Sequence, residues 1–326
     1  MYKCVKLEPK INIIKDRAVK FLEEFNLRYE TLDTLYAIIN EKGDWLAIGG
    51  QNDNVLKCFA IKDNYKGEGL FDSIISSLIT DSFNEGIDEL FVYTKPRYLE
   101  IFKSFNFDPL AQTENSCLLL RNEGGVESIL KSLDYQADDS NIGSIVMNAN
   151  PFTKGHLYLI QRARQKVDRV LVFIVEKEND QFPFSDRFQL VKEAVRDIKD
   201  VIVLPSTNLI VSNATFPSYF LKENELVDIE HAKIDAEIFK RYFVPRFNIK
   251  IRFLGTEPYD KSTAIYNKVL KDTLNPDCSV EIIKRLRKDE DFISASKVRD
   301  LILKGKIEEI REMVPENVYE YILRKS

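Results

Sequence analysis

The residues of this 326-residue chain that are best suited to chemistry are His156 and the turn before it. An apolar run that begins at Gly143 leads into the segment Asn-Ala-Asn-Pro-Phe-Thr-Lys-Gly-His, which ends at His156. This order predicts a strand, a tight turn and the start of a helix. A helix N-terminus carries unpaired N–H donors and about half a positive charge. An imidazole at that place can donate a hydrogen bond to a phosphoryl group.

A second segment suited to an anion is Ile-Ser-Ala-Ser-Lys-Val-Arg at 293–299, which follows the last expected strand and opens a helix. Ser294 and Ser296 offer hydroxyls, and Lys297 or Arg299 offers a positive charge. Each segment alone has a plain structural explanation, which is helix capping or packing. Together, on the first and last strand-to-helix turns of one expected α/β domain, they favour a phosphate site.

Both segments resemble signatures of the nucleotidyltransferase superfamily, Thr153–His156 the (H/T)xGH motif and 293–299 the ISxSxxR motif. The resemblance implies in-line attack on the α-phosphorus of ATP, with pyrophosphate as the leaving group and Mg²⁺ held mainly by the triphosphate. It implies no metal ligand from the protein. The residues expected to be catalytic are His156, Lys154, Ser296 and Arg299. The residues expected to bind the nucleotide are Asn148, Ala149, Asn150, Thr153, Gly155, Arg187, Gly255, Thr256, Glu257 and Ser294.

Two of these expectations leave alternatives open. Arg187 opens a helix after the second strand of the expected α/β domain, where it is either a phosphate ligand or a member of a surface salt bridge. Gly255-Thr-Glu at the end of a later strand can offer backbone groups to adenine or ribose, and the carboxylate of Glu257 can accept a hydrogen bond from a ribose hydroxyl. The same segment is otherwise a turn that ends a strand.

Nearly the whole chain is similar to the citrate lyase ligase family. The stretches that carry this similarity are Met147–His156, Ser212–Lys222 and Phe253–Pro258. The resemblance implies that acetate is activated as acetyl-adenylate, after which the acetyl group passes to a thiol and AMP leaves. It also implies a protein partner, because the thiol belongs to the CoA-like prosthetic arm on the acyl carrier subunit of citrate lyase.

The elements that must position these residues follow from hydrophobic periodicity. After about residue 142, uniformly apolar strands alternate with helices, which predicts a Rossmann-like, doubly wound parallel sheet that binds ligands beyond the carboxyl ends of its strands. The strands are expected at 143–149, 170–176, 201–205, 249–254 and 279–284, and the helices at 156–168, 185–199, 233–244 and 262–272.

The first part of the chain has a different pattern, typical of an α+β domain. Gly67 and Gly69, between an expected strand and a helix, resemble the (Q/R)xxGxG/A segment of GNAT acetyltransferases, although Asn64 replaces the usual Gln or Arg. We expect this domain either to bind the prosthetic arm of the partner or to be a scaffold. Its strands are expected at 34–40, 44–49, 55–62, 88–94 and 115–121, and its helices at 69–83 and 97–105. The domain limits are expected at 1–122 and 142–326, with a linker at 123–141.

Composition narrows the possible partners and locations. The formal charge of −5 and the absence of a basic cluster argue against nucleic-acid binding. The chain has no apolar run of about 18 residues and no signal-like start, so we expect no membrane segment and a cytoplasmic location. The four cysteines are widely spaced, which predicts neither zinc nor disulfides, and Cys58 and Cys117 lie in strand-like apolar runs where buried thiols are expected.

Two other functions fit the same residues. One is an adenylyltransferase that acts on a phosphorylated small-molecule acceptor. The other is a GNAT N-acetyltransferase whose second domain senses nucleotide. Three assays separate the possibilities. The ligase predicts acetate-dependent exchange of pyrophosphate into ATP, and the adenylyltransferase predicts exchange that requires a phosphate ester. The acetyltransferase predicts consumption of acetyl-CoA without ATP.

Overall fold

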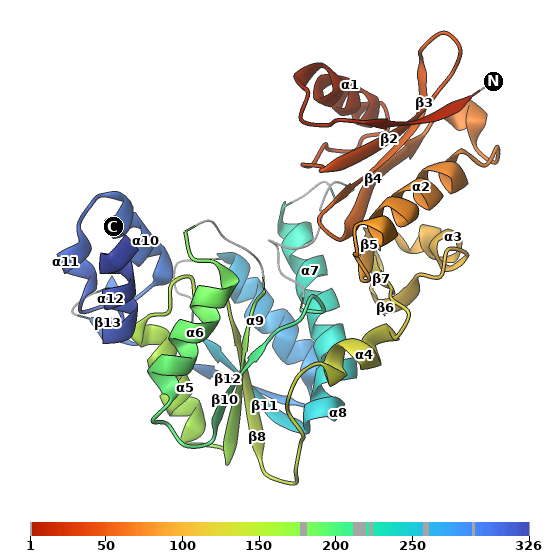
Figure 1. The fold of residues 1–326 in the computed structure, drawn as a ribbon. Coiled ribbons are helices and arrows are strands. Elements are labelled where there is room, and N and C mark those ends of the chain that lie inside the picture. The colour runs from red at the N-terminus through yellow and green to blue at the C-terminus, as the bar shows by residue number, and fades with distance from the viewer. Residues whose placement is uncertain are drawn as a thin grey trace. The chain divides into compact units, whose positions relative to one another are not determined.

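Contacts within the chain divide it into two units, which are described separately (Figure 1). Unit 1 comprises Met1–Val126 and Thr215–Ile234, and unit 2 comprises Glu127–Ala214 and Asp235–Ser326. The domain limits expected from the sequence did not include the return of 215–234 to unit 1. The computed structural model describes residues 2–176, 181–210, 220–221, 224–256, 261–288 and 291–325.

Unit 1 is a mixed sheet with helices, in the strand order β1-β2-β3-β4-β5-β7-β6. This arrangement confirms the α+β architecture that the sequence predicts. The strands are β1 (Lys3–Leu7), β2 (Thr34–Ile39), β3 (Trp45–Asn52), β4 (Val55–Ile61), β5 (Leu90–Thr94), β6 (Asp108–Gln112) and β7 (Cys117–Arg121). The helices are α1 (Asn12–Glu23), α2 (Leu70–Asn84) and α3 (Leu99–Lys103), with short 3₁₀ turns at Asp63–Tyr65 and Pro96–Tyr98. The strand β1, the helix α1 and the strand β6 were not predicted.

The strands β4 and β5 are parallel but pair only near their beginnings. Val55 is opposite Phe91 and Leu56 is opposite Val92, and no later residue of either strand continues the ladder. Cys58, two residues on, has a φ of 61°, in the left-handed region that non-glycine residues seldom adopt. The two strands therefore separate towards their carboxyl ends.

The last part of unit 1 is anchored by a buried carboxylate. Glu230, on α7 (Asn224–Ile238), is 0% exposed and accepts hydrogen bonds from the hydroxyls of Thr113 and Ser116 and, at 3.4 Å, from the amide of Asn115. Burial alone would raise the pKa of Glu230, but these donors hold it below its usual value. A buried, ionised carboxylate surrounded by donors explains why the beginning of α7 belongs to unit 1.

Unit 2 contains a five-stranded sheet in the order β10-β9-β8-β11-β12, and every neighbouring pair in it is parallel. This confirms the predicted doubly wound sheet. The strands are β8 (Ile142–Met147), β9 (Arg169–Ile174), β10 (Val201–Pro205), β11 (Ile249–Gly255) and β12 (Ser279–Ile283), with a small hairpin of β13 (Arg287–Lys288) and β14 (Asp291–Phe292). The helices are α4 (Gly125–Lys131), α5 (Lys154–Arg164), α6 (Phe184–Val195), the end of α7 with a π-helical turn at Phe239–Phe243, α8 (Val244–Phe247), α9 (Lys261–Leu274), α10 (Ala295–Leu303), α11 (Ile307–Ile310) and α12 (Glu316–Lys325).

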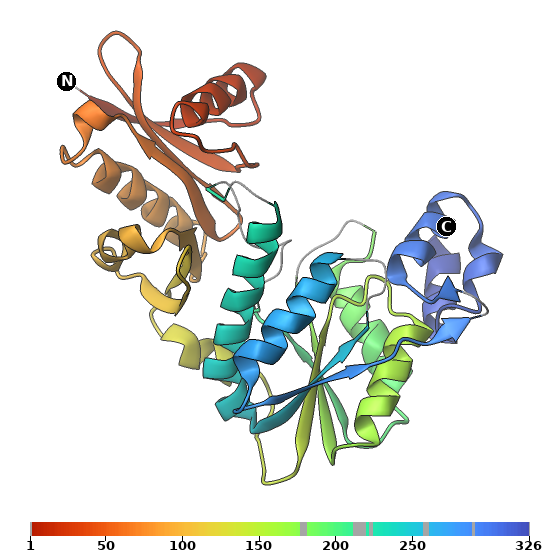
Figure 2. The ribbon, with the colours of Figure 1, turned by 180° about the vertical axis from the view of Figure 1, so that it is seen from behind.

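Both faces of this sheet are covered, which is why the central strand β9 is apolar and buried from Val170 to Ile174, whereas the edge strand β12 contains Ser279 and Glu281. In β9, Val172 and Ile174 pack in the core under α5 and α6, while Phe173 points to the other face and contacts Phe243 and Phe247. Figures 1 and 2 show α5 and α6 on one side of the sheet and α8 and α9 on the other. The carboxyl ends of β8, β11 and β12 therefore share one edge, from which the turns to α5, α9 and α10 emerge.

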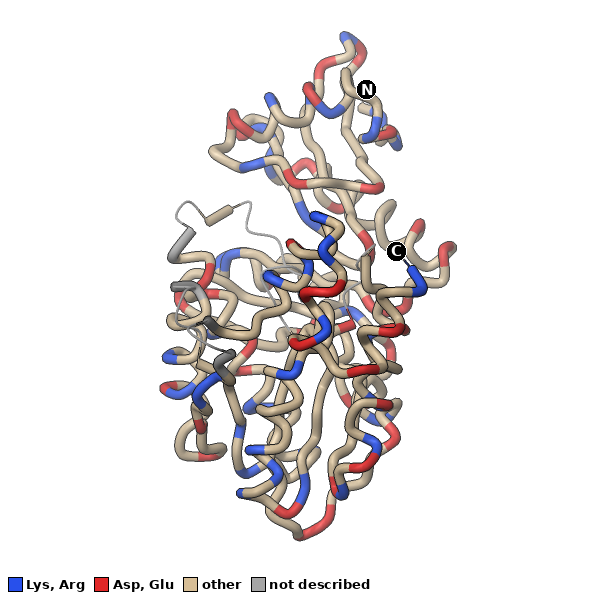
Figure 3. The backbone as a smooth tube through the Cα atoms, turned by 90° about the vertical axis from the view of Figure 1, so that its left-hand side faces the viewer, with Lys and Arg blue, Asp and Glu red and all other residues tan. Residues whose placement is uncertain are grey.

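Charged residues are mixed over the part of the chain that the structure describes. In Figure 3, the Lys and Arg residues are interspersed with the Asp and Glu residues in each unit. No helix among the described residues is long and apolar enough to cross a membrane.

Candidate active site

The turn between β8 and α5 is held in an unusual backbone conformation by a buried arginine. Ala149 has a φ of 49°, which is costly for a residue with a Cβ. Arg187 is 2% exposed, and its Nη1 donates to the carbonyl oxygens of Asn148 (2.6 Å) and Val175 (2.9 Å). Its Nε donates to the carbonyl oxygen of Phe182 at 3.0 Å. The surface salt bridge considered for Arg187 is therefore wrong, and the guanidinium braces the turn instead.

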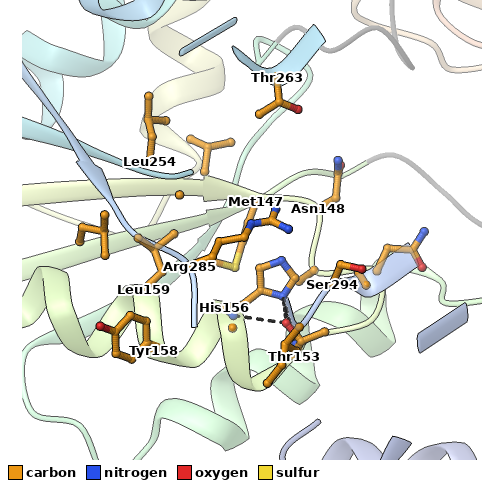
Figure 4. A pocket seen from close by; sticks show the side chains of 18 of the residues that line it. Met147, Asn148, Thr153, His156, Tyr158, Leu159, Leu254, Thr263, Arg285 and Ser294 are labelled. Carbon is orange, nitrogen blue, oxygen red and sulfur yellow. Dashed lines mark hydrogen bonds between the residues drawn. The ribbon is translucent and has the colours of Figure 1, made fainter. Parts of the chain in front are cut away.

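His156 is fixed by a capping box at the start of α5. Thr153 is the N-cap residue, and its Oγ1 accepts the backbone N–H of His156 at 3.3 Å. The backbone N–H of Thr153 donates in return to Nδ1 of His156 at 3.1 Å. Because Nδ1 is an acceptor, a neutral ring carries its proton on Nε2. Figure 4 shows Nδ1 against Thr153 and the opposite edge of the ring facing the cavity.

The surroundings of His156 keep the ring neutral. Two causes lower the pKa of His156 from 6.5 to about 4. The larger is the loss of water around the imidazole, and the smaller is the positive charge of Arg285. At neutral pH the ring is thus an uncharged donor through Nε2–H. Phe152 stacks on it, with ring centroids 5.7 Å apart and planes inclined by 16°, so the ring is held on its flat side as well.

The second motif starts α10 in a similar way. Ser294 is the N-cap residue, and its Oγ accepts the backbone N–H of Lys297 at 3.2 Å. Ser296 is exposed, and its hydroxyl donates to Oγ of Ser294 at 3.4 Å. The two hydroxyls therefore lie together at a helix N-terminus, where N–H groups favour an anion.

The two motifs are in contact. A Cβ added to Gly155 would lie 3.2 Å from the carbonyl oxygen of Ile293, so only glycine fits there without movement of the neighbouring backbone. Nη1 of Arg299 donates to the carbonyl oxygen of Asn150, which ties α10 to the turn before α5. The segments around 156 and 296, far apart in the sequence, therefore form one surface.

That surface lines a cavity of about 670 Å³ at the carboxyl edge of the sheet (Figure 4). Of the described residues that line it, four are cationic and none is Asp or Glu; the cations are Arg187, Lys284, Arg285 and Arg299. Such a wall favours a polyanionic ligand. The predicted residues brought together here are Asn148, Ala149, Asn150, Thr153, Gly155, His156, Arg187, Gly255, Ser294, Ser296 and Arg299.

Other predicted residues lie elsewhere. Nζ of Lys154 donates to the carbonyl oxygen of Arg311 at 3.3 Å, and Lys154 is not among the residues that line the cavity. Thr256 does not line it either, since its Oγ1 accepts the backbone N–H of Arg285 at 3.0 Å. Glu257 lies outside the described residues, as do Thr215 and Phe216 of the Ser212–Lys222 stretch.

The glycines of the predicted CoA-binding turn belong to unit 1. Gly67 and Gly69 have φ values of 85° and 73°, and Gly69 directly precedes α2. Both positions require the left-handed region that glycine adopts without strain. The geometry therefore fits a tight turn into a helix N-terminus.

Sequence reasoning missed Arg285. It follows β12 and lines the cavity beside His156. Its signal was available, because a cation directly after the last parallel strand lies at the edge where such sheets bind ligands. Sequence reasoning also missed the wall that α9 contributes through Thr263, Tyr266 and Asn267.

The thiols do not take part in the cavity. Cys58, Cys117 and Cys278 are free and buried, as expected for the first two, and burial raises the pKa of Cys58 to about 12. Within the described ranges, no group of three or more His, Cys, Asp or Glu side chains is placed to hold a metal ion.

Comparison with known proteins gives two kinds of match. Residues 142–322 match the family model of the citrate lyase ligase C-terminal domain. The [Citrate [pro-3S]-lyase] ligases of Escherichia coli K12 and Klebsiella pneumoniae are 34% and 33% identical to the chain, over 93% and 97% of it and 88% and 96% of the relatives. A phosphopantetheine adenylyltransferase of Clostridium tetani is 27% identical over 57% of the chain and 98% of its own length.

Proposed function

Because this chain belongs to the citrate lyase ligase family, we propose that it is an AMP-forming acid–thiol ligase that acetylates the acyl carrier subunit of citrate lyase. In the first step a carboxylate oxygen of acetate attacks the α-phosphorus of ATP, and the bond to the bridging oxygen of pyrophosphate breaks. In the second step the thiol of the prosthetic arm attacks the acetyl carbonyl. The thioester forms, AMP leaves, and the thiol proton passes to solvent.

The observation that carries this proposal is the convergence of two distant helix N-termini on one cavity with a cationic wall. ATP carries its charge on three linked phosphoryl groups, so a ligand of that length can contact both helix starts at once. In-line phosphoryl transfer asks the protein mainly to position the reactants and to offset developing charge.

The geometry supports a role for each part of the site. Nε2–H of neutral His156 donates to the α-phosphoryl group, while the hydroxyls of Ser294 and Ser296 and the guanidinium of Arg299 hold the β- and γ-phosphoryl groups. Gly155 and the turn at 148–150 offer backbone at close range, and Arg187 keeps that turn in place. Mg²⁺ would be held mainly by the triphosphate itself and would offset part of its negative charge.

Unit 1 is proposed to receive the prosthetic arm. The separation of β4 from β5 leaves strand edges that can pair with the amides of a pantetheine chain, in the manner of an added strand. The turn at Gly67 and Gly69 can offer N–H groups to the phosphates of such an arm. The cytoplasmic location remains a prediction from the sequence.

The adenylyltransferase reading also has an observation in its favour, which is the relative named phosphopantetheine adenylyltransferase. In that case the acceptor is a phosphate ester instead of a carboxylic acid. The cavity can take either acceptor, because both attack the same phosphorus as anions.

Exchange of labelled pyrophosphate into ATP separates the two functions. The ligase reading predicts exchange with acetate and Mg²⁺ alone, since the first step is complete without the carrier protein. Exchange that requires a phosphate ester and ignores acetate would overturn it. The same reaction followed by transfer to the purified acyl carrier subunit tests the second step.

A further inference from the structure

Arg285 lies where the first motif and the end of the sheet meet. It follows β12 by two residues and lines the cavity, and Figure 4 shows its side chain beside the ring of His156. The side chain passes over Gly255: a Cβ added to Gly255 would be 4.0 Å from both Cγ and Nε of Arg285. The guanidinium therefore approaches His156 from the β11–β12 side, opposite α5.

The backbone of Arg285 is fixed by Thr256. The N–H of Thr256 donates to the carbonyl oxygen of Ile283 at 2.9 Å, which extends the β11–β12 pairing by one residue. The N–H of Arg285 then donates to Oγ1 of Thr256 at 3.0 Å. Thr256 thus sets the point from which the arginine side chain starts, although it does not line the cavity itself.

The other two arginines of the cavity are engaged differently. Arg187 donates to three backbone carbonyl oxygens and Arg299 to one, so each stabilises the turn at 148–150. Arg285 is the arginine whose charge acts on His156, and that charge helps to lower the pKa of the imidazole. Two donors beside each other, one neutral and one cationic, fit a single anionic group between them.

We propose that Arg285 is a catalytic residue whose guanidinium contacts the same non-bridging oxygens of the α-phosphoryl group as Nε2–H of His156, with Thr256 as its positioning residue. This inference rests on the proposed function. When the acetate oxygen bonds to phosphorus and the bond to pyrophosphate breaks, negative charge gathers on those oxygens. A cation fixed there stabilises the transition state more than the bound substrate.

The kinetic test compares Arg285→Gln and Arg285→Lys with Arg162→Gln. Arg162 is exposed on α5, does not line the cavity, and donates a hydrogen bond to Gln165. Arg162→Gln therefore removes the same charge as Arg285→Gln at a place away from the cavity. We expect Arg285→Gln to lower kcat of acetate-dependent exchange by about a hundredfold, the usual effect of removing one transition-state donor, while KM for ATP changes less. Arg285→Lys should recover part of the rate and Arg162→Gln should match the wild type. A kcat for Arg285→Gln within threefold of the wild type would overturn the proposal.

A binding test examines the role of Arg285 without depending on which carboxylic acid is the substrate. AMP carries only the α-phosphoryl group, so Arg285→Gln should weaken AMP binding by about tenfold or more. Ser296→Ala should instead weaken the binding of ATP and leave the affinity for AMP unchanged. This holds even if acetate proves not to be the substrate. Equal AMP affinity in wild type and Arg285→Gln would contradict the assignment.

The positioning role has its own readout. Thr256→Val removes the acceptor for the N–H of Arg285, and Thr256→Ser keeps it. We expect the valine variant to lose kcat in the same direction as Arg285→Gln, and the pKa of His156, followed by NMR, to rise in both. A His156 titration that does not change in Arg285→Gln would show that the guanidinium is not beside the ring.

Discussion

At the scale of single residues, the proton of one imidazole decides how the site works. A charged His156 would attract a phosphate more strongly, but its Nδ1 would carry a proton and could no longer accept the backbone N–H of Thr153. A neutral ring with its proton on Nε2 gives a directed donor instead. The cavity keeps it neutral by removing water and by placing a cation nearby. The arginines thereby supply the positive charge that attracts the phosphate, and His156 supplies a hydrogen-bond donor with a fixed direction.

The titration of His156 in the free protein is the first prediction. Its pKa should be near 4, so its NMR signals should show no change through pH 6.5. The unfolded chain takes up this proton near pH 6.5 and the folded chain does not, so the free energy of unfolding should fall as the pH drops from about 6.5 towards 4. Above pH 6.5 this group should contribute no change. The chain has only two histidines, so His156→Ala assigns the signal, and a midpoint near 6.5 would refute the account.

The contrast between His156 and Lys154 is the second prediction. His156→Ala should lower acetate-dependent exchange by about a hundredfold or more. Lys154→Ala should cost less than about tenfold if its ammonium group stays on the carbonyl oxygen of Arg311. Steady-state exchange rates at saturating ATP measure both. A loss at Lys154 as large as that at His156 would mean that the lysine turns into the cavity when ATP binds, in agreement with the catalytic role expected from the sequence.

At the scale of elements, two helix starts carry the site, and each is fixed by a side-chain cap. Thr153 caps α5 and Ser294 caps α10, so the residues at which the helices begin also determine where the free N–H groups point. The glycine between them in space, Gly155, lets α5 approach the segment before α10 closely. A small change at either cap should therefore affect stability and catalysis together.

The third prediction concerns the cap of α5. Thr153→Val should lower the free energy of unfolding by about 1 kcal/mol, because the N–H of His156 loses its acceptor. It should also lower exchange several-fold, since Oγ1 of Thr153, 3.0 Å from Nδ1, no longer helps to fix the ring. Thr153→Ser is the matched control and should retain most of both quantities. Chemical denaturation and the exchange assay give the two numbers.

Much of the element layout could be predicted, for a physical reason. The central strands of unit 2 are mostly buried, so they are apolar runs that stand out in the sequence, as 170–176 does for β9. The helix expected at 233–244 is instead the end of α7, a π-helical turn and α8, because local periodicity does not resolve such changes. The strand expected at 143–149 ends at Met147. The next carbonyl oxygen, that of Asn148, accepts a hydrogen bond from Arg187 instead of pairing with a neighbouring strand.

The candidate site could be predicted only where motifs are local. The residues of the two signatures lie together because each signature is one turn with its helix. Arg285 and the α9 wall were not assigned: a cation after a parallel strand predicts a place at the ligand-binding edge, but which strand ends border the cavity depends on the order of strands in the sheet. The carbonyl-binding role of Arg187 and the turning away of Lys154 depend on tertiary contacts that no spacing in the sequence encodes.

At the scale of the whole molecule, the two steps of the proposed reaction are assigned to different units. Adenylate formation needs only the cavity of unit 2, while transfer to the thiol also needs the arm-binding surface proposed for unit 1. The carrier protein should therefore affect only the second step.

The fourth prediction tests this division. Gly67→Ala strains the turn before α2, because Gly67 has a φ of 85°. Gly86→Ala is a matched control at the other end of α2, with a φ of 75° and, as at Gly67, no atom within 4 Å of the added Cβ. We expect Gly67→Ala to slow acetyl transfer to the carrier by about tenfold and to leave acetate-dependent exchange unchanged. Equal transfer rates in the two variants would leave unit 1 without the proposed role.

The route of the chain between the units has a consequence for inheritance. The polypeptide leaves unit 2 after Ala214, supplies Glu230 to the buried network of unit 1, and returns to unit 2 within α7. A genetic crossover at any one place would leave one module without a segment that its own core requires. A transfer of unit 1 to another protein would therefore have to include both 1–126 and 215–234.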